Sequence, residues 1–482
     1  MIAHFIGIDV GTQGVRVILA GEDGSIAGSQ EKKTALNDHY RTEQSPEEWW
    51  SAVLECLQIL LAELPAQFDR ALIKAVSVTS TSGTVIPLNT ANQPLHQALM
   101  YSDNRSEEEG KRCRQTAIEH NPDGYTAFNS SSGLAKMVWY VEHFPEKVAE
   151  IHTWIHAADF IIGRLSGHYR ITDYTNALKS GYDITRNAWP TYICEQLPIR
   201  KEWLQEVVPS GTPIGALTTE LSESLQIPTV QVVAGMTDGC ASQVASGAVN
   251  PGDWNTTIGT TLVIKGVTEN EIKDPEGRLY CHRHPEGYWM PGGASNTGAD
   301  WISTDFKHAD LIELNKASEK LYPTPWLVYP LKQEGERFPF ISKTARGFSD
   351  EQIPNPETFF TAGMEGVAYI EKLCFDLVEK LSGEKPKAVF TAGGGSNSDI
   401  WLKIRASVLN CPVYKMANTS GALGAAILAA SKTHFSTLGQ AAATMTLTDS
   451  ITYPEEEKAE KYRQQYQNFK NELVKRGYLV EF

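Results

Sequence analysis

Apolar positions in the first part of the chain follow a strand pattern and then change to a helical spacing. Residues 5–10 and 15–20 are rich in apolar and β-branched side chains, and a short turn with two glycines separates them. A second glycine-containing turn precedes residues 26–28, so three antiparallel strands joined by tight turns are expected. Ser45 is a candidate N-cap, and apolar residues then recur at helical spacing over 49–64. The pattern predicts an α/β domain that opens with a hairpin sheet.

The second half of the chain repeats the combination of strand and glycine-rich turn. Residues 255–258 and 262–265 have a strand pattern on either side of a Gly-Thr-Thr turn, as 5–10 and 15–20 have around Gly-Thr-Gln-Gly. A later strand over 388–392 leads through three glycines into a helix from about Ser398. The repeated pattern of strand, glycine-rich turn and strand favours two related domains.

The length of the chain also requires more than one domain, since 482 residues exceed what one compact core holds. Glycine, asparagine and proline interrupt the pattern between residues 246 and 253. We therefore expect an N-terminal domain over 1–246 and a C-terminal domain over 247–482. The charged residues 455–475 are expected to form a solvated surface helix.

Composition restricts the class of partner. The formal charge is −15, which repels nucleic-acid phosphates and anionic lipid, so no nucleic acid and no membrane is expected as a partner and a small molecule is favoured. No stretch of about eighteen apolar residues and no signal-like N-terminus is apparent. Seven scattered cysteines without a Cys-x-x-Cys pair indicate reduced thiols, hence a cytoplasmic location. The crowded Cys281–His284 segment is disfavoured as a zinc site.

The first candidate site is the turn after residues 5–10. Gly11, Thr12 and Gln13 would let backbone N–H groups approach phosphate oxygens closely. Asp9, at the end of the preceding strand, could reach a hydrated Mg²⁺. An ordinary hairpin turn is the alternative. A dinucleotide-binding fingerprint is excluded by the glycine spacing and by the strand, instead of a helix, that follows Gly14.

The second candidate site is Asp238, which follows the strand pattern of residues 230–234. Gly235 and Gly239 would let another molecule approach the carboxylate in a turn that precedes a helix over 240–248. This suits a general base, which must lie within hydrogen-bonding distance of the hydroxyl that it deprotonates. The alternative is an aspartate that only caps the helix.

Two further glycine-rich segments lie near the C-terminus. Gly393–Asn397 separates a strand from a helix, where a flat ligand could lie against the backbone, although a flexible loop would look the same. Residues 421–426 (Gly-Ala-Leu-Gly-Ala-Ala) open a helix that is narrow enough for close packing.

The five motifs in this order resemble the FGGY carbohydrate kinases, and the resemblance covers nearly the whole chain. It implies two ribonuclease-H-like α/β domains of the actin and hexokinase superfamily around a central cleft. It also implies transfer of the γ-phosphate of ATP, with Mg²⁺, to a hydroxyl of a sugar or polyol. The partners would be the sugar and ATP, and the protein a monomer or homodimer.

The resemblance also assigns roles to individual residues. Asp238 matches the catalytic base and Asp9 the carboxylate near the metal. The nucleotide residues implied in the two phosphate turns and the adenosine loop are Gly11, Thr12, Gln13, Gly259, Thr260, Thr261, Gly394, Gly395 and Asn397. The sugar residues implied, beside Asp238, are Ser82, Thr84, Asp103 and Arg105. The resemblance places the sugar site and the base in 1–246 and the nucleotide site in 247–482.

Two departures from the family pattern bear on detail. Many members carry a glutamate just before the Gly-Ala-x-Gly-Ala-Ala helix, where this chain has residues 418–420 (Asn-Thr-Ser). Familiar xylulose kinases carry Gln-Met-His where residues 79–84 read Thr-Ser-Thr-Ser-Gly-Thr. The Thr-Ser-Gly-Thr turn of 81–84 and residues 100–105 (Met-Tyr-Ser-Asp-Asn-Arg) are similar to the D-ribulose kinase branch of the family. This resemblance implies D-ribulose as substrate and D-xylulose after it. A sugar-independent ATPase or nucleotide switch of the same superfamily, or a sugar-binding protein without catalysis, are the alternatives.

Overall fold

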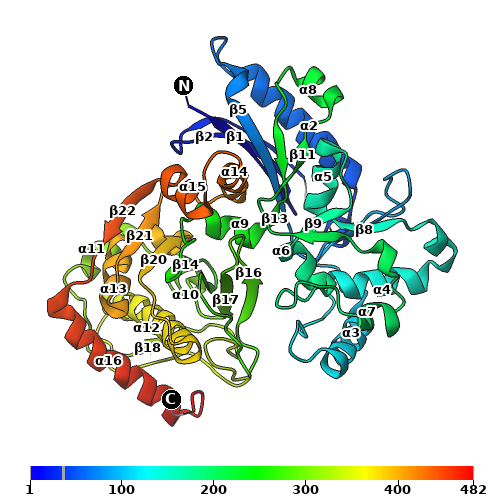
Figure 1. Cartoon of the computed structure of the whole chain (residues 1–482). Coiled ribbons are helices and arrows are strands. Elements are labelled where there is room, and N and C mark those ends of the chain that lie inside the picture. The colour runs from blue at the N-terminus through cyan, green and yellow to red at the C-terminus, as the bar shows by residue number, and fades with distance from the viewer. Residues whose placement is uncertain (1, 35–37, 481–482) are drawn as a thin grey trace. The chain divides into compact units, whose positions relative to one another are not determined.

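The computed structural model describes residues 2–34 and 38–480, which divide into two compact units (Figure 1). The first unit holds Met1–Gly247, His282–Gly287 and Asn418–Thr446. The second holds Ala248–Cys281, Tyr288–Ala417 and Leu447–Phe482. The units therefore differ from two continuous domains over 1–246 and 247–482, because two segments of the second half pack into the first unit.

A mixed sheet forms the centre of the first unit, with the strand order β11-β12-β5-β1-β2-β3 and β13 beside β5. Its strands are β1 (His4–Gly11), β2 (Gly14–Gly21), β3 (Ile26–Lys33), β5 (Ile73–Ser80), β11 (Pro213–Ala216), β12 (Gln231–Val233) and β13 (Met236–Thr237). The predicted antiparallel hairpins of β1, β2 and β3 are confirmed, and β5 pairs with β1 in parallel.

Alternation along β1 gives the sheet two different faces. Ile6, Ile8 and Val10 belong to one hydrophobic cluster with side chains of α2 (Pro46–Glu63), which begins after the N-cap Ser45 as predicted. On the other face, Gly7 and Asp9 lie against α14 (Gly421–Ser431). Successive side chains of a strand point to opposite faces, so the odd positions of β1 meet α14. Figure 1 shows this helix, in orange, beside the blue strands of the sheet.

The remaining elements of the first unit form smaller layers. A short sheet has the order β4-β7-β6-β8, and β9 pairs with β10. Its strands are β4 (Glu43–Gln44), β6 (Val85–Leu88), β7 (Ala98–Leu99), β8 (Thr153–His156), β9 (Ile171–Asp173) and β10 (Glu206–Val208). The helices are α1 (Asp38–Thr42), α3 (Glu107–His120), α4 (Gly133–His143), α5 (Ala157–Ser166), α6 (Tyr174–Ala177), α7 (Tyr192–Glu195), α8 (Thr219–Leu225), α9 (Asp238–Ala245) and α15 (Leu438–Met445).

The second unit repeats the mixed sheet, with the order β16-β17-β15-β14-β20-β21-β22. Its strands are β14 (Asp253–Ile258), β15 (Leu262–Gly266), β16 (Tyr280–Arg283), β17 (Trp289–Ser295), β20 (Ala388–Ala392), β21 (Val413–Met416) and β22 (Thr448–Thr452), and β18 (Val328–Tyr329) pairs with β19 (Phe348–Ser349) apart from them. Its helices are α10 (Asp300–Asp305), α11 (Leu311–Ser318), α12 (Pro356–Ser382), α13 (Asp399–Leu409) and α16 (Glu456–Lys475). As in the first unit, an antiparallel hairpin (β14–β15) is extended by a parallel strand, β20.

The last helix, α16, is not the fully solvated helix that its charge suggested. Tyr462, Phe469 and Leu473 are buried, and the Tyr462 hydroxyl donates to Glu365 of α12 at 3.0 Å. These positions recur at helical spacing, so the helix is amphipathic and covers the core of its unit. No helix among the described residues has the length and apolar content needed to cross a bilayer.

Candidate active site

Two aspartates of the first unit influence each other electrostatically. The pKa of Asp9 is raised from 3.8 to about 6, first because the carboxyl is buried and second because of the negative charge of Asp238. Arg16, opposite Asp9 in the β1–β2 register, acts in the other direction. Residues predicted separately, at opposite ends of the first unit's sequence, are thus brought together by the fold.

Glycines let α14 approach this pair closely. A Cβ on Gly421 would lie 2.8 Å from Oδ2 of Asp9, so the first turn of α14 covers the carboxyl. A Cβ on Gly7 would meet the carbonyl oxygen of Ala422 at 1.8 Å, and one on Gly424 the carbonyl oxygen of Ala241 at 1.9 Å. The close packing predicted for 421–426 is therefore confirmed, and it presses α14 against both β1 and α9.

Asp238 lies at the first position of α9, after the N-cap Thr237. The predicted helix over 240–248 is present with other bounds, since it runs from Asp238 to Ala245, whereas the turn expected over 235–239 gives way to β13, which extends the sheet to Thr237. The Asp238 carboxylate accepts from the N–H of Gly239 at 2.6 Å. Gly235 serves close packing, since a Cβ there would lie 2.0 Å from the carbonyl oxygen of Val78.

The turn predicted to bind phosphate consists of Thr12 and Gln13, between the paired residues Gly11 and Gly14. Gly14 has a φ of 138°, and a Cβ there would lie 2.2 Å from the carbonyl oxygen of Lys32, so only glycine fits. The sequence argument missed Gln44, which is buried and donates to the carbonyl oxygen of Thr12 at 3.0 Å.

The oxygen of the Gln44 amide accepts from the indole of Trp49 at 2.8 Å, and its nitrogen donates again to the carbonyl of Tyr40 at 2.9 Å. An amide with three partners ties the turn to the start of α2. A polar residue just before the N-cap Ser45 was the only signal in the sequence.

The segments predicted to line the sugar site lie near each other. The Thr84 hydroxyl accepts from the N–H of Tyr101 at 3.2 Å. Arg105 forms ion pairs with Asp103 and with Glu43, the latter at 2.6 Å, and its guanidinium lies 5.0 Å from the ring centre of Trp139. The guanidinium is therefore fixed between two carboxylates and an indole.

Lys136 of α4 was also missed. Its ammonium is buried and donates to the carbonyl oxygens of Asp103, at 3.0 Å, and of Ser130. Burial lowers the pKa of Lys136 to about 8, against the opposing effect of Asp103. These two hydrogen bonds connect the Asp103 segment with α4.

Two hydroxyls beside these segments are buried without a partner among the described residues, those of Thr79 and Ser82. Buried polar atoms in proteins are nearly always hydrogen-bonded, so each has capacity for a partner that is not part of the described protein.

In the second unit, the Gly259–Thr261 turn is held by the segment that follows β17. The carbonyl of Gly259 accepts from Ala299 at 2.7 Å, and the N–H of Leu262 donates to Thr297 at 3.0 Å. Buried Glu336 in turn accepts from the hydroxyls of Ser295, at 2.8 Å, and Thr297, at 2.9 Å. Glu336 was not predicted, since it lies in a loop with no motif.

A cavity of about 870 Å³ in the same unit includes three residues of the predicted adenosine loop. Gly394, Gly395 and Asn397 line one side of it, before the N-cap Ser398 of α13. The rest is lined by apolar side chains, among them Phe306 and the 78% exposed Ile312, together with polar and charged ones such as Lys307, Lys316 and Glu319. Ala299 lines this cavity and also donates its N–H to the carbonyl of Gly259, so the two predicted nucleotide segments adjoin.

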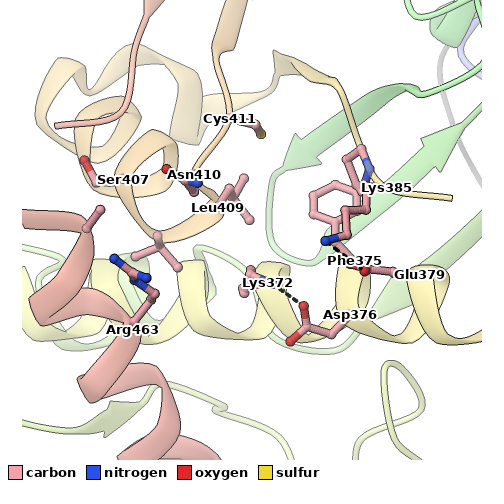
Figure 2. Close-up of a pocket in the computed structure, with 13 residues that line it drawn as sticks. Lys372, Phe375, Asp376, Glu379, Lys385, Ser407, Leu409, Asn410, Cys411 and Arg463 are labelled. Atoms are coloured by element: carbon pink, nitrogen blue, oxygen red, sulfur yellow. Dashed lines mark hydrogen bonds and ion pairs between the residues drawn. The ribbon is translucent and has the colours of Figure 1, made fainter. Parts of the chain in front are cut away.

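A second, smaller cavity of about 360 Å³ in this unit contains none of the predicted residues (Figure 2). Both of its carboxylates are in ion pairs, Asp376 with Lys372 and Glu379 with Lys385 at 3.2 Å, while Arg463 pairs with Glu460.

Within residues 2–34 and 38–480, no group of three or more His, Cys, Asp and Glu side chains is arranged to hold a metal ion. Mg²⁺ does not need three such side chains, because it keeps several waters and uses one or two carboxylates. The carboxylate of Asp9 fits this mode, since it lies against α14 and the negative charge of Asp238 adds to a site that favours a cation.

Comparison with known protein families identifies the family to which the chain belongs. Residues 4–245 match the model of the FGGY family of carbohydrate kinases, N-terminal domain, and residues 254–433 match that of the C-terminal domain. The chain belongs to the FGGY family of carbohydrate kinases. It is therefore a phosphotransferase that uses ATP and a sugar, and its two-domain α/β fold of the actin and hexokinase kind is confirmed.

Individual FGGY relatives match over nearly their full length. The chain is 26% identical to a xylulose kinase of Bacillus subtilis, over 97% of this chain and 96% of the relative. It is 26% identical to a gluconokinase of Bacillus licheniformis, over 89% and 87%. The crystal structure of a xylulose kinase from Rhodospirillum rubrum superimposes with a TM-score of 0.84 at 23% identity, covering 98% of each chain.

Proposed function

We propose that this kinase phosphorylates a ketopentose, with D-ribulose preferred and D-xylulose second, at the terminal C5 hydroxyl. Asp238 is the general base and Asp9 acts through Mg²⁺. The observation that carries the proposal is the placement of Asp9 and Asp238 on either side of β5, where Asp9 and Met236 both pair with Thr79, since phosphoryl transfer needs a proton acceptor and neutralised phosphate charge at one point.

Asp238 accepts the proton of the sugar hydroxyl as the oxygen attacks the γ-phosphorus of ATP, whose bond to the bridging oxygen of the β-phosphate breaks so that ADP leaves. Its place at the start of α9 supports this role, because the helix N-terminus favours the ionised carboxylate that a base requires. Asp9 would hold Mg²⁺, and the ion would supply positive charge against the phosphate oxygens. The raised pKa of Asp9 supports a site that gains from a cation.

The nucleotide is assigned to three segments. Backbone N–H groups of the Thr12–Gln13 and Gly259–Thr261 turns hold the phosphates, and Gln44 and Glu336 keep the two turns in shape. The adenosine lies in the cavity formed by Gly394, Gly395 and Asn397 with Phe306 and Ile312. A large, mostly apolar cavity beside glycine backbone suits a flat base.

The sugar is assigned to the side of Asp238 that includes Ser82, Thr84, Asp103 and Arg105. The unpartnered hydroxyl of Ser82 supports this, because a sugar hydroxyl would complete its hydrogen bonding. The small hydroxyls of 79–84 favour D-ribulose over the D-xylulose of the named relatives, since a site rejects ligands that leave its buried polar groups unpaired.

The test is a comparison of kcat/KM for D-ribulose, D-xylulose, L-ribulose, gluconate, glycerol and ribitol. D-ribulose is expected to exceed every other substrate by about tenfold or more, corresponding to about 1.4 kcal/mol. Preference for D-xylulose or gluconate would contradict the D-ribulose assignment and leave the kinase intact. ATP hydrolysis that no sugar stimulates would point instead to a nucleotide switch.

A further inference from the structure

The carboxylate of Asp173, at the end of β9, is completely buried and lies outside the assigned active site. One of its oxygens accepts from the N–H of Thr175 at 2.7 Å, from the Thr175 hydroxyl at 2.6 Å and from Ser210 at 3.0 Å. The other accepts from the side-chain amide of Asn176 at 2.5 Å. Each of these partners is a donor, so the group is organised as an acceptor at both oxygens.

The hydroxyl of Thr175 has one proton, which it donates in the hydrogen bond to Asp173. The oxygen of the same hydroxyl accepts from the backbone N–H of Thr237 at 2.8 Å. An N–H can only donate and an ionised carboxylate can only accept, so the direction of both hydrogen bonds is fixed. A chain of two hydrogen bonds therefore leads from Asp173 to the residue immediately before Asp238.

Thr237 decides where Asp238 lies. It is the N-cap of α9, with Asp238 next, and its own side chain makes no capping hydrogen bond. On one side β13 pairs with β5, and on the other the helix begins. Its N–H is buried, and without Thr175 it would lose the acceptor that keeps the residue in place.

We propose that Thr175, oriented by Asp173, is a positioning residue that holds Asp238 at the distance from the sugar hydroxyl that proton transfer requires. This rests on the proposed role of Asp238 as the base. A displacement of about 1 Å in a reacting group can lower the rate about a hundredfold. A small shift of Thr237 would therefore reduce turnover although Thr175 does not contact the substrate.

The test compares Thr175→Val, which has the same shape without a hydroxyl, with Thr175→Ser, which keeps the hydroxyl. Thr175→Val is expected to lower kcat about 10- to 100-fold, with KM for sugar and for ATP within about threefold of the unmodified protein. Thr175→Ser is expected to retain kcat within about threefold. Equal losses in the two variants, or full kcat in Thr175→Val, would overturn the proposal.

A double-mutant cycle separates positioning from a general effect on folding. In the Asp238→Asn background, Thr175→Val should change the residual rate by less than about threefold, because the group that it positions is already gone. The same loss in both backgrounds would overturn the proposal. If Asp238→Asn alone keeps full turnover, the assignment of the base fails first, which is a separate outcome.

Thermal unfolding of each variant shows whether the fold is kept. Should Thr175→Val not fold, Thr175→Cys replaces it, because a thiol donates and accepts only weakly. The cysteine variant is expected to have a kcat below that of Thr175→Ser with unchanged KM values. A kcat equal to that of Thr175→Ser would contradict the need for a strong acceptor at Thr237.

Discussion

Asp9 and Asp238 have different environments although they influence each other. Asp9 lies within the buried strand β1 and is covered by α14, so its charged form is disfavoured by burial and by the charge of Asp238. Asp238 begins a helix, where free N–H groups favour negative charge. The difference supports a division of roles in which Asp9 favours a cation and Asp238 accepts a proton.

Asp238→Asn is expected to lower kcat by about a hundredfold or more with ATP binding unchanged, because an amide cannot take the hydroxyl proton. Steady-state kinetics and nucleotide titration by calorimetry measure the two effects. Asp123→Asn is the matched control, since that carboxylate is 76% exposed and its nearest cation, Arg186, is 3.8 Å away. Near-normal turnover in Asp238→Asn would remove Asp238 as the base.

Glu365 of α12 gives a pH prediction for stability. It is completely buried and accepts from Thr324 and from Tyr462 of α16, and burial raises its pKa from 4.5 to about 7. The folded protein therefore binds a proton more tightly than the unfolded chain between pH 4.5 and 7. The contribution of Glu365 to the free energy of unfolding should fall as pH rises through that window.

Glu365→Gln removes the charge and keeps the shape, since the amide oxygen can accept from Tyr462 and the amide nitrogen can donate to the Thr324 hydroxyl. The variant is expected to be more stable than the unmodified protein at pH 8 and similar at pH 4.5. Denaturant unfolding at the two pH values measures the difference. A variant that is less stable at pH 8 would show that the ionised carboxylate is favourable there.

At the scale of elements, α14 connects the sheet with the helix that carries Asp238. All eleven of its residues are buried, as expected of a helix that is apolar on every side. Gly7 and Gly424 bring its backbone against β1 and α9. The position of α9, and with it Asp238, thus depends on how closely the backbone of α14 approaches β1 and α9.

Gly424→Ala is expected to destabilise the protein by about 3 kcal/mol or more, because the new methyl group meets the backbone of Ala241, which cannot rotate away. Activity should fall as α9 is displaced. In the control, Gly28→Ala, the nearest atom is a side-chain carbon of Leu60 at 3.3 Å, so the loss should be small. Equal melting temperatures for the two variants would contradict the close contact of α14 with α9.

Elements with a local signal could be predicted from the sequence. The β1–β2–β3 hairpins and α2 follow from periodicity, tight turns and the Ser45 cap, which involve neighbours in the chain. The start of α9 was missed, because β13 depends on pairing with β5, far away in sequence. Gln44, Lys136, Thr175 and Glu336 were missed because each is a single polar residue outside any motif, and the contact that gives it its role is with a residue distant in the chain.

At the scale of the whole molecule, neither unit is a continuous stretch of chain. The first unit needs Asn418–Thr446, which supplies α14, and this segment lies between two parts of the second unit in the sequence. The family models meet between residues 245 and 254, so a cut at that point would separate α14 from the sheet face that it covers.

A fragment of residues 1–247 is expected to lack a cooperative thermal transition, because the face of β1 that carries Gly7 and Asp9 would be exposed. Joining residues 418–446 to it through a flexible linker should restore a transition, monitored by circular dichroism. A cooperative transition in the fragment alone would show that α14 is dispensable for folding.

The place of α14 in the sequence also determines when the first unit can be finished during synthesis. Asp9 leaves the ribosome about 400 residues before Gly421. At about 5–20 residues per second, roughly 20–80 s separate them. Throughout this interval one face of the nascent sheet lacks its helix, while β1, β2 and β5 are already available for pairing. A trigger-factor-like or Hsp70-like chaperone that recognises apolar strands would have its longest time to bind during this interval. A mutation that slows the docking of α14 would lower the yield of active enzyme even where the finished protein is stable.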